Sequence, residues 1–404
     1  MPDGPLSGVK VLDFTWVVAA PGASRVMADF GATVVRVETT KRIDTARTFG
    51  PFHTGAPGPE HSVLFQSMNA GKLGVTLDLS TPEGRAVALD LVRWADVVME
   101  AFSPGTIASF GLDYESLRKT KPDLIMLSTC IFGQSGPLSG FAGYGSLAAA
   151  ISGFYFMTGW PDRPPAGPYN AYTDTVVPRF VLISLLAALD HRRRTGAGCY
   201  IDQSHIETAL HFLTPALLDY TVNGRGPERA GNRHPQIAPH GVYPAAGEDR
   251  WVAIVCETNE QWRALCDALG RPELANDERF ASMTARLAHQ DELDAIISNW
   301  TAQREPHETE ALLQERGVPC SAVQRGADLV ADPQLQHRGH FVRAPHATLG
   351  EILVEGTRFK LSRTPPRVER AGPTMGQHNQ YVLQELLGYS EERIVELVAA
   401  GALE

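Results

Sequence analysis

The N-terminal third of the chain alternates short β-branched runs with longer stretches whose apolar residues recur at helical spacing. Val9–Phe14 is one such run, residues 22–30 have the helical spacing, and Ala32–Glu38 is a second run. Strand, helix and strand that follow one another within about 30 residues form a βαβ unit. The pattern therefore predicts a parallel sheet.

The alternation continues along the next stretch of chain. We predict strands at Gly74–Leu79, Ala95–Glu100 and Leu124–Thr129, separated by helices over 81–94 and 114–120. Strands that alternate with helices in this way are typical of α/β folds.

Longer helices replace this alternation in the second half. Asp174–Arg194 has apolar residues at helical spacing and ends in a basic run before Gly196, which is a helix stop. We predict one further helix at Asp202–Asn223 and a polar linker at Arg225–Gly241. The remaining predictions are a strand at 251–256, helices at 260–269, 291–302 and 307–316, strands and turns over 343–365, and helices at 379–387 and 390–399.

Size and composition exclude several classes of protein. With 404 residues the chain is too long for one core and predicts two to three domains. A net charge of -10 argues against a nucleic-acid-binding protein, which needs a basic face. No apolar stretch reaches the roughly 18–20 residues that span a bilayer, and Met1–Lys10 lacks the pattern of a signal peptide. Five scattered cysteines without a CxxC pair predict a cytoplasmic protein with no metal site.

Two segments have chemical content, and each has an ordinary structural explanation as well. Thr15–Gly22 joins the first strand to the first helix, where α/β proteins bind ligands, but it lacks the GxGxxG and P-loop patterns. Asp174 follows a loop and precedes a helix, so it is either an N-cap or an exposed carboxylate nucleophile. His234 and His240 lack an acidic partner, which disfavours a metal site there.

Several segments together resemble the class III CoA-transferases, the CaiB/BaiF-like group that includes formyl-CoA and carnitine CoA-transferases. The segments are residues 5–38, VTLDLSTPEGR at 75–85, ADVVMEAFSPG at 95–105, residues 110–128, and YTDTVVPRFVLISLLAALDHRRRTGAGCYIDQSHIE at 172–207. GNRHPQIAPHGVYP, LQERGVPCSAV and LLGYSEERI follow in the expected order. Each segment is weak alone, but their order and spacing are specific.

The resemblance implies a Rossmann-like large α/β domain with an inserted smaller α+β domain, in an interlocked, ring-like homodimer. Residues 1–224 and 329–404 would form the large domain, and residues 225–328 the small one. Asp174 matches the active-site aspartate. The implied CoA contacts are Val18, Ala19, Thr39, Leu77, Asp78, Ser80, Ala101, Phe102 and Ser103, with Arg36, Lys41, Arg42 and Lys72 as candidates for the phosphates.

The implied activity is transfer of CoA from an acyl-CoA thioester to a free carboxylic acid, without a metal. Asp174 would form a mixed anhydride and then an aspartyl-CoA thioester, and an acceptor carboxylate would reverse the sequence. The alternative is an α-methylacyl-CoA racemase of the same fold. Racemases of this group use a Gly-His-Asp segment, and the equivalent here is Gly143–Gly145, which lacks the histidine base.

Departures from the family pattern bear on the substrate. Trp16, Val17 and Val18 stand where relatives often have Gln or His, and Gly145 stands where many have an acid. These changes argue against formyl-CoA and oxalate. The apolar first loop and the aromatic segment at 154–156 instead suggest a medium-sized or aromatic acceptor acid, with succinyl-CoA as donor.

Overall fold

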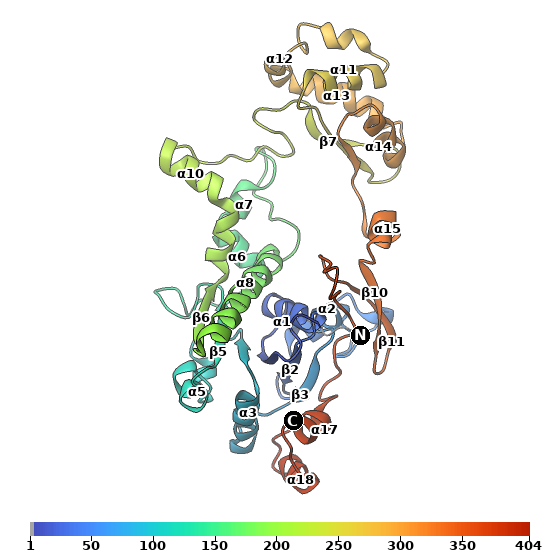
Figure 1. Ribbon diagram of the computed structural model, residues 1–404. Coiled ribbons are helices and arrows are strands. Elements are labelled where there is room, and N and C mark those ends of the chain that lie inside the picture. Colours follow the sequence, from blue (N-terminus) through green and yellow to red (C-terminus); the bar gives the residue numbers. More distant parts are fainter. Residues whose placement is uncertain (1–3) are drawn as a thin grey trace. The chain divides into compact units, whose positions relative to one another are not determined.

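The computed structural model describes residues 4–404, which form two compact units (Figure 1). The first contains the described residues up to Tyr155 together with Gly167–Pro227 and Gln334–Glu404. The second contains Phe156–Ala166 and Glu228–Pro333.

A six-stranded parallel sheet forms the centre of the first unit. Its strands are β1 (Lys10–Phe14), β2 (Thr33–Glu38), β3 (Leu73–Thr76), β4 (Val97–Glu100), β5 (Ile125–Cys130) and β6 (Cys199–Ser204). They lie in the order β3-β2-β1-β4-β5-β6, and every neighbouring pair is parallel. The predicted parallel sheet is therefore confirmed. The order reverses between β1 and β4, which is where doubly wound sheets bind ligands.

Helices cover both faces of this sheet. Successive strand residues point to opposite faces, so Leu12 and Val35 pack on one side while Val11 and Val34 pack on the other. The first side is covered by α3 (Pro82–Trp94), α5 (Tyr114–Thr120) and α18 (Glu391–Ala399). The second is covered by α1 (Ala19–Asp29) and α8 (Tyr172–Thr195).

Shorter elements complete the first unit. They are α2 (Val63–Met68), α4 (Thr106–Ser109), α6 (Gly145–Ile151), α9 (His205–Leu210), α10 (Thr214–Asn223), α17 (Asn379–Tyr381), the 3-10 turns Thr45–Thr48, His53–Gly55 and His211–Leu213, the π-helical turn Val382–Leu386, and the antiparallel pair β10 (Phe341–His346) and β11 (Gly350–Glu355). Helices α7 (Phe154–Met157) and α16 (Pro333–His337) lie where the chain passes between units.

The second unit is a small antiparallel sheet covered by helices. Its strands are β7 (His240–Pro244), β8 (Trp251–Val255) and β9 (Cys320–Ala322). Its helices are α11 (Asn259–Ala268), the 3-10 turn Pro272–Asn276, α12 (Met283–Ala288), α13 (Gln290–Thr301), α14 (Pro306–Glu315) and α15 (Gly326–Ala331). Trp262, Phe280 and Ile297 lie at the centre of its own core.

The prediction of one helix over 202–223 is wrong. Strand β6 runs to Ser204, whose side chain accepts a hydrogen bond from the Glu207 amide and so starts α9. The polar residues Asp202 and Gln203 obscured the strand, because β6 is an edge strand with alternating exposure. The N-cap explanation of Asp174 is also wrong, because α8 begins at Tyr172 and its N-cap is Ala171.

Helix α8 also departs from the expectation that no segment has the length and apolarity of a membrane span. It has 24 residues, and one 18-residue window reaches a mean hydropathy of 1.4. However, Val177, Val181 and Leu185 of α8 are buried against α1 and the sheet. A long core helix of a globular unit has the same composition, so we assign no membrane span to α8.

Candidate active site

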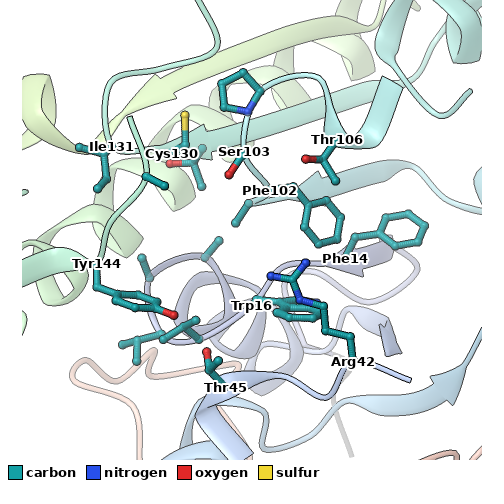
Figure 2. A pocket seen from close by; sticks show the side chains of 18 of the residues that line it. Phe14, Trp16, Arg42, Thr45, Phe102, Ser103, Thr106, Cys130, Ile131 and Tyr144 are labelled. Atoms are coloured by element: carbon teal, nitrogen blue, oxygen red, sulfur yellow. The ribbon is translucent and has the colours of Figure 1, made fainter. Parts of the chain in front are cut away.

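A cavity of about 660 Å³ lies in the first unit at the carboxyl ends of the sheet strands (Figure 2). Every strand contributes to its wall through the residues that follow it, from Trp16 after β1 to His205 after β6. The carboxyl ends of parallel strands meet at one edge of a sheet, which explains why segments distant in sequence converge here. Val18 and Ala19 bring the start of α1 into the wall, where helix amides are free to bind anions.

Eleven of the fourteen residues predicted for the site line this one cavity. They are Val18, Ala19, Thr39, Arg42, Leu77, Asp78, Ser80, Ala101, Phe102, Ser103 and Asp174. Figure 2 shows Ser103 and Phe102 after β4 on one side of the cavity and Arg42 on the other, across the ring of Trp16. The Arg42 guanidinium is 5.5 Å from the centre of that ring.

Arg36 is one of the three exceptions, and its assignment to CoA needs correction. It is completely buried, pairs with Asp44 and donates a hydrogen bond of 2.7 Å to the Thr15 carbonyl. Asp44 in turn accepts hydrogen bonds from the Val17 amide at 3.1 and 3.2 Å. Val17 has a φ of 69°, a conformation that is strained for a β-branched residue. Arg36 therefore holds the strained loop of the cavity wall in place and does not face a ligand.

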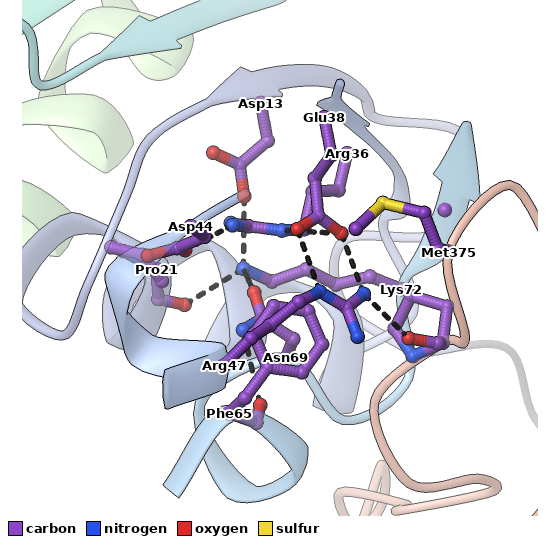
Figure 3. A network of polar contacts seen from close by, with 12 residues as sticks. Asp13, Pro21, Arg36, Glu38, Asp44, Arg47, Phe65, Asn69, Lys72 and Met375 are labelled. Atoms are coloured by element: carbon purple, nitrogen blue, oxygen red, sulfur yellow. Dashed lines mark hydrogen bonds and ion pairs between the residues drawn. The ribbon is translucent and has the colours of Figure 1, made fainter. Parts of the chain in front are cut away.

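Of the other cations proposed for the CoA phosphates, two bind acidic side chains and one lines the cavity. Lys72 is buried and bonds to the Asp13 carboxylate and the Asn69 side chain, each at 2.8 Å (Figure 3). Lys41 is half exposed and bonds to Asp78 at 2.6 Å. Arg42 is thus the one lysine or arginine from residues 4–404 that lines the cavity.

Asp174 lies in the first turn of α8 with its side chain in the cavity wall. It is 7% exposed, and burial raises the pKa of its carboxyl to about 6, against a lowering by the backbone amide of Gly145. The Thr173 hydroxyl donates a hydrogen bond of 2.8 Å to the Gly145 carbonyl and so ties α8 to the start of α6. The carboxylate is ionised at neutral pH but poorly solvated, which suits a nucleophile.

Gly145 leaves the space that Asp174 occupies. A Cβ atom on Gly145 would lie 2.4 Å from Asp174 Oδ1. We therefore expect Gly145→Ala to displace the carboxylate and lower kcat by about 100-fold, since a shift of about 1 Å has that effect on a positioned group. Gly140→Ala is the matched control, because a Cβ there meets no atom within 4 Å. Steady-state rates of both variants test this, and equal rates would contradict it.

Residues that the sequence did not single out also line the cavity. Thr129 and Cys130 are the last residues of β5, Ile131 follows them, and His205 follows β6. The incorrect helix over 202–223 concealed His205, since a correctly placed β6 would have put this residue at the carboxyl edge of the sheet. Phe154, Tyr155 and Phe156 do not line the cavity, so the expectation of an aromatic acceptor keeps only the apolar first loop, Trp16–Val18, as its basis.

The cavity wall offers a carboxylate free of lysine and arginine on Asp174, one guanidinium, a histidine and helix amides, beside the ion-paired Glu38 and Asp78, and this set suits covalent acyl chemistry on a large anionic ligand. In the described part of the chain, no cluster of three or more His, Cys, Asp or Glu side chains is arranged to hold a metal ion.

Comparison with known proteins gives this cavity a context. A succinyl-CoA–D-citramalate CoA-transferase of Chloroflexus aurantiacus is 35% identical over 98% of this chain and 98% of its own. A succinate–glutarate CoA-transferase of Agrobacterium fabrum is 38% identical over 95% of this chain and 96% of its own. The crystal structure of a CAIB/BAIF family protein from Brucella suis has a TM-score of 0.88 and 33% identity, and covers 95% of this chain and 100% of that one.

These similarities extend over nearly the whole chain, and they identify an enzyme that transfers CoA between an acyl-CoA and an acid. Residues 6–379 match the model of the family described as CoA-transferase family III. The chain therefore belongs to CoA-transferase family III.

Proposed function

We propose that Asp174 is the nucleophile of this CoA transfer and that the cavity at the strand ends binds CoA. The observation that carries the proposal is a buried, ionisable carboxylate in the cavity wall that no lysine or arginine of the described chain neutralises. A carboxylate in an ion pair would be a poorer nucleophile, because the pair would have to break before attack.

The chemistry keeps the acyl group activated at every step. Asp174 attacks the thioester carbonyl, the C–S bond breaks, and a mixed anhydride and CoA thiolate form. The thiolate then attacks the aspartyl carbonyl, which releases the donor acid and leaves an aspartyl-CoA thioester. The acceptor carboxylate attacks that thioester, and the same thiolate returns to the new anhydride to give the new acyl-CoA. Binding of the distant CoA moiety positions the thioester for these attacks.

We propose short dicarboxylic acids as the substrate class. The two curated relatives described above are named for succinyl-CoA with D-citramalate and for succinate with glutarate. The cavity of this chain has room for such an acid, and Arg42 supplies a cation in its wall.

A panel assay tests the transfer. Succinyl-CoA is incubated with glutarate, malate, citramalate, oxalate or benzoate, and acyl-CoA products are separated by chromatography. We expect new acyl-CoA from the dicarboxylic acids that have four or five carbons in the main chain. The same incubation in deuterated water, without an acceptor, tests the racemase alternative. Deuterium at the α-carbon with no transfer of CoA to any acid would contradict the proposed transfer and favour the racemase alternative.

We further propose that two copies assemble, as the resemblance implied. Helices α8 and α10 expose large apolar side chains, including Ile183, Leu218 and Val222, which is 75% exposed. A second copy would cover them, and sedimentation equilibrium should then give the mass of two chains.

We also propose that the smaller domain extends from residue 225 to residue 328 and that the protein is cytoplasmic.

A further inference from the structure

His205 is buried beside Asp174 and has no hydrogen-bond partner within the described protein. Its side chain lies at the start of α9, directly after β6, and is 9% exposed in the wall of the cavity. Neither ring nitrogen accepts or donates a hydrogen bond to another residue. An unsatisfied buried imidazole is costly, so such a group needs an explanation.

The histidine faces the reacting carboxylate. His205 Nδ1 is 3.9 Å from Asp174 Oδ1, which is too long for a hydrogen bond but leaves no room for another group between the two atoms. Burial lowers the pKa of His205 to about 4, so the ring is neutral at pH 7 and carries one N–H donor. Cys130 ends the neighbouring strand β5 and also lines the cavity, and burial raises the pKa of its thiol to about 11, so it adds no charge.

We propose that His205 is a further catalytic residue, whose Nδ1–H binds the oxyanion that forms on Asp174 Oδ1. This inference depends on the proposed function, because the oxyanion exists only if Asp174 is acylated. When CoA thiolate attacks Asp174 Cγ in the mixed anhydride, the new S–C bond places the negative charge on an Asp174 oxygen. The C–O bond to the departing donor carboxylate then breaks and the carbonyl re-forms, with no proton transferred.

Two of the four carbonyl attacks in the cycle have this geometry. Thiolate attack on the anhydride and acceptor attack on the aspartyl-CoA thioester both place charge on Asp174. The first and last attacks place it on the acyl carbonyl of the substrate, away from Asp174. A donor near Asp174 Oδ1 therefore accelerates the middle steps selectively. Donors of this kind lie near the developing charge and typically contribute factors of about 10²–10³ in rate.

Substitutions at His205 separate this role from a structural one. His205→Leu removes the donor, and His205→Asn keeps an N–H close to the position of Nδ1. We expect His205→Leu to lower the transfer rate by about 100-fold with the KM for acyl-CoA within about twofold. We expect His205→Asn to recover most of the lost rate. His211→Leu is the control, because His211 does not line the cavity.

The partition of products gives the readout that a folding defect would not change. In His205→Leu the anhydride and free thiolate persist for longer, so thiol trapped by a disulfide reagent should rise about tenfold relative to transferred product. A proportional fall of both products, equal loss in the Asn and Leu variants, or a wild-type rate in His205→Leu would overturn the role of His205. If the wild-type enzyme itself transferred CoA to no acid, the proposed function would fail instead.

Discussion

Replacement of Asp174 by Asn should lower the rate of CoA transfer by a factor on the order of 10⁴ or more, because it removes the atom that forms both covalent intermediates. The amide has nearly the same shape as the carboxylate and can occupy the space beside Gly145. Borohydride should reduce the aspartyl-CoA thioester of the wild-type enzyme to an alcohol with release of CoA, so mass spectrometry should find a reduced side chain at residue 174 in the wild-type enzyme and none in the variant.

The same substitution should make the protein more stable at neutral pH. The folded-state pKa of Asp174 is raised from 3.8 to about 6, so the folded protein holds this proton more tightly than the unfolded chain does. Stability therefore falls as pH rises from about 4 to about 6, and the full cost of burying the charge remains above that range. The shift of roughly two pKa units corresponds to about 3 kcal/mol. The free energy of unfolding of Asp174→Asn should therefore exceed that of the wild-type protein by this amount at pH 7.5, and the two should be equal below pH 4.

The activity of the wild-type enzyme should depend on pH in the opposite direction to its stability. The nucleophile is the ionised carboxylate, so transfer should decline as pH falls through about 6. Asp190→Asn is the control for both measurements, because Asp190 lies on the same helix but is exposed and pairs with Arg193 and Arg194. Unchanged transfer in Asp174→Asn, with Asp190→Asn also unchanged, would exclude Asp174 as the nucleophile.

Sequence patterns predicted the parallel sheet well because the buried strands consist of apolar runs. Strands β1 and β2 each contain three Val, Leu or Phe residues, and Gly31 separates α1 from β2. Strand β6 was missed because an edge strand satisfies one side with solvent and carries polar residues such as Asp202. The boundaries of the helices next to β6 depend on which side chains are buried, and only the tertiary structure supplies that information.

The residues of the candidate site also divide into those that the sequence could predict and those that it could not. The residues directly after strands lie together in one cavity as expected, because the carboxyl edge of a parallel sheet brings them together whatever their type. The failure at Arg36 has another origin. A cation inside a strand looks the same in sequence whether it faces a ligand or a buried acid, and the ion pair with Asp44, eight residues after Arg36, decides between the two. Gly145 and His205 gained meaning only from their distances to Asp174.

Arg47 should be the residue whose loss most destabilises the first unit. Its guanidinium donates to both oxygens of Glu38 at 2.9 and 2.8 Å (Figure 3). It also donates to the Glu60 carboxylate at 2.8 Å. It also donates to the Pro373 carbonyl at 3.0 Å, which joins the N-terminal strands to the C-terminal segment. The side chain is completely buried over the ring of Phe65.

Arg47→Met should lower the free energy of unfolding by about 3–5 kcal/mol, because it leaves the Glu38 carboxylate and the Pro373 carbonyl buried with fewer partners. Arg225→Met breaks the exposed ion pair with Asp219 and should cost less than about 1 kcal/mol. Urea unfolding followed by fluorescence compares the two variants. Equal midpoints would mean that solvent reaches the buried acids after the substitution, and that the network around Arg47 does not connect the C-terminal segment to the sheet.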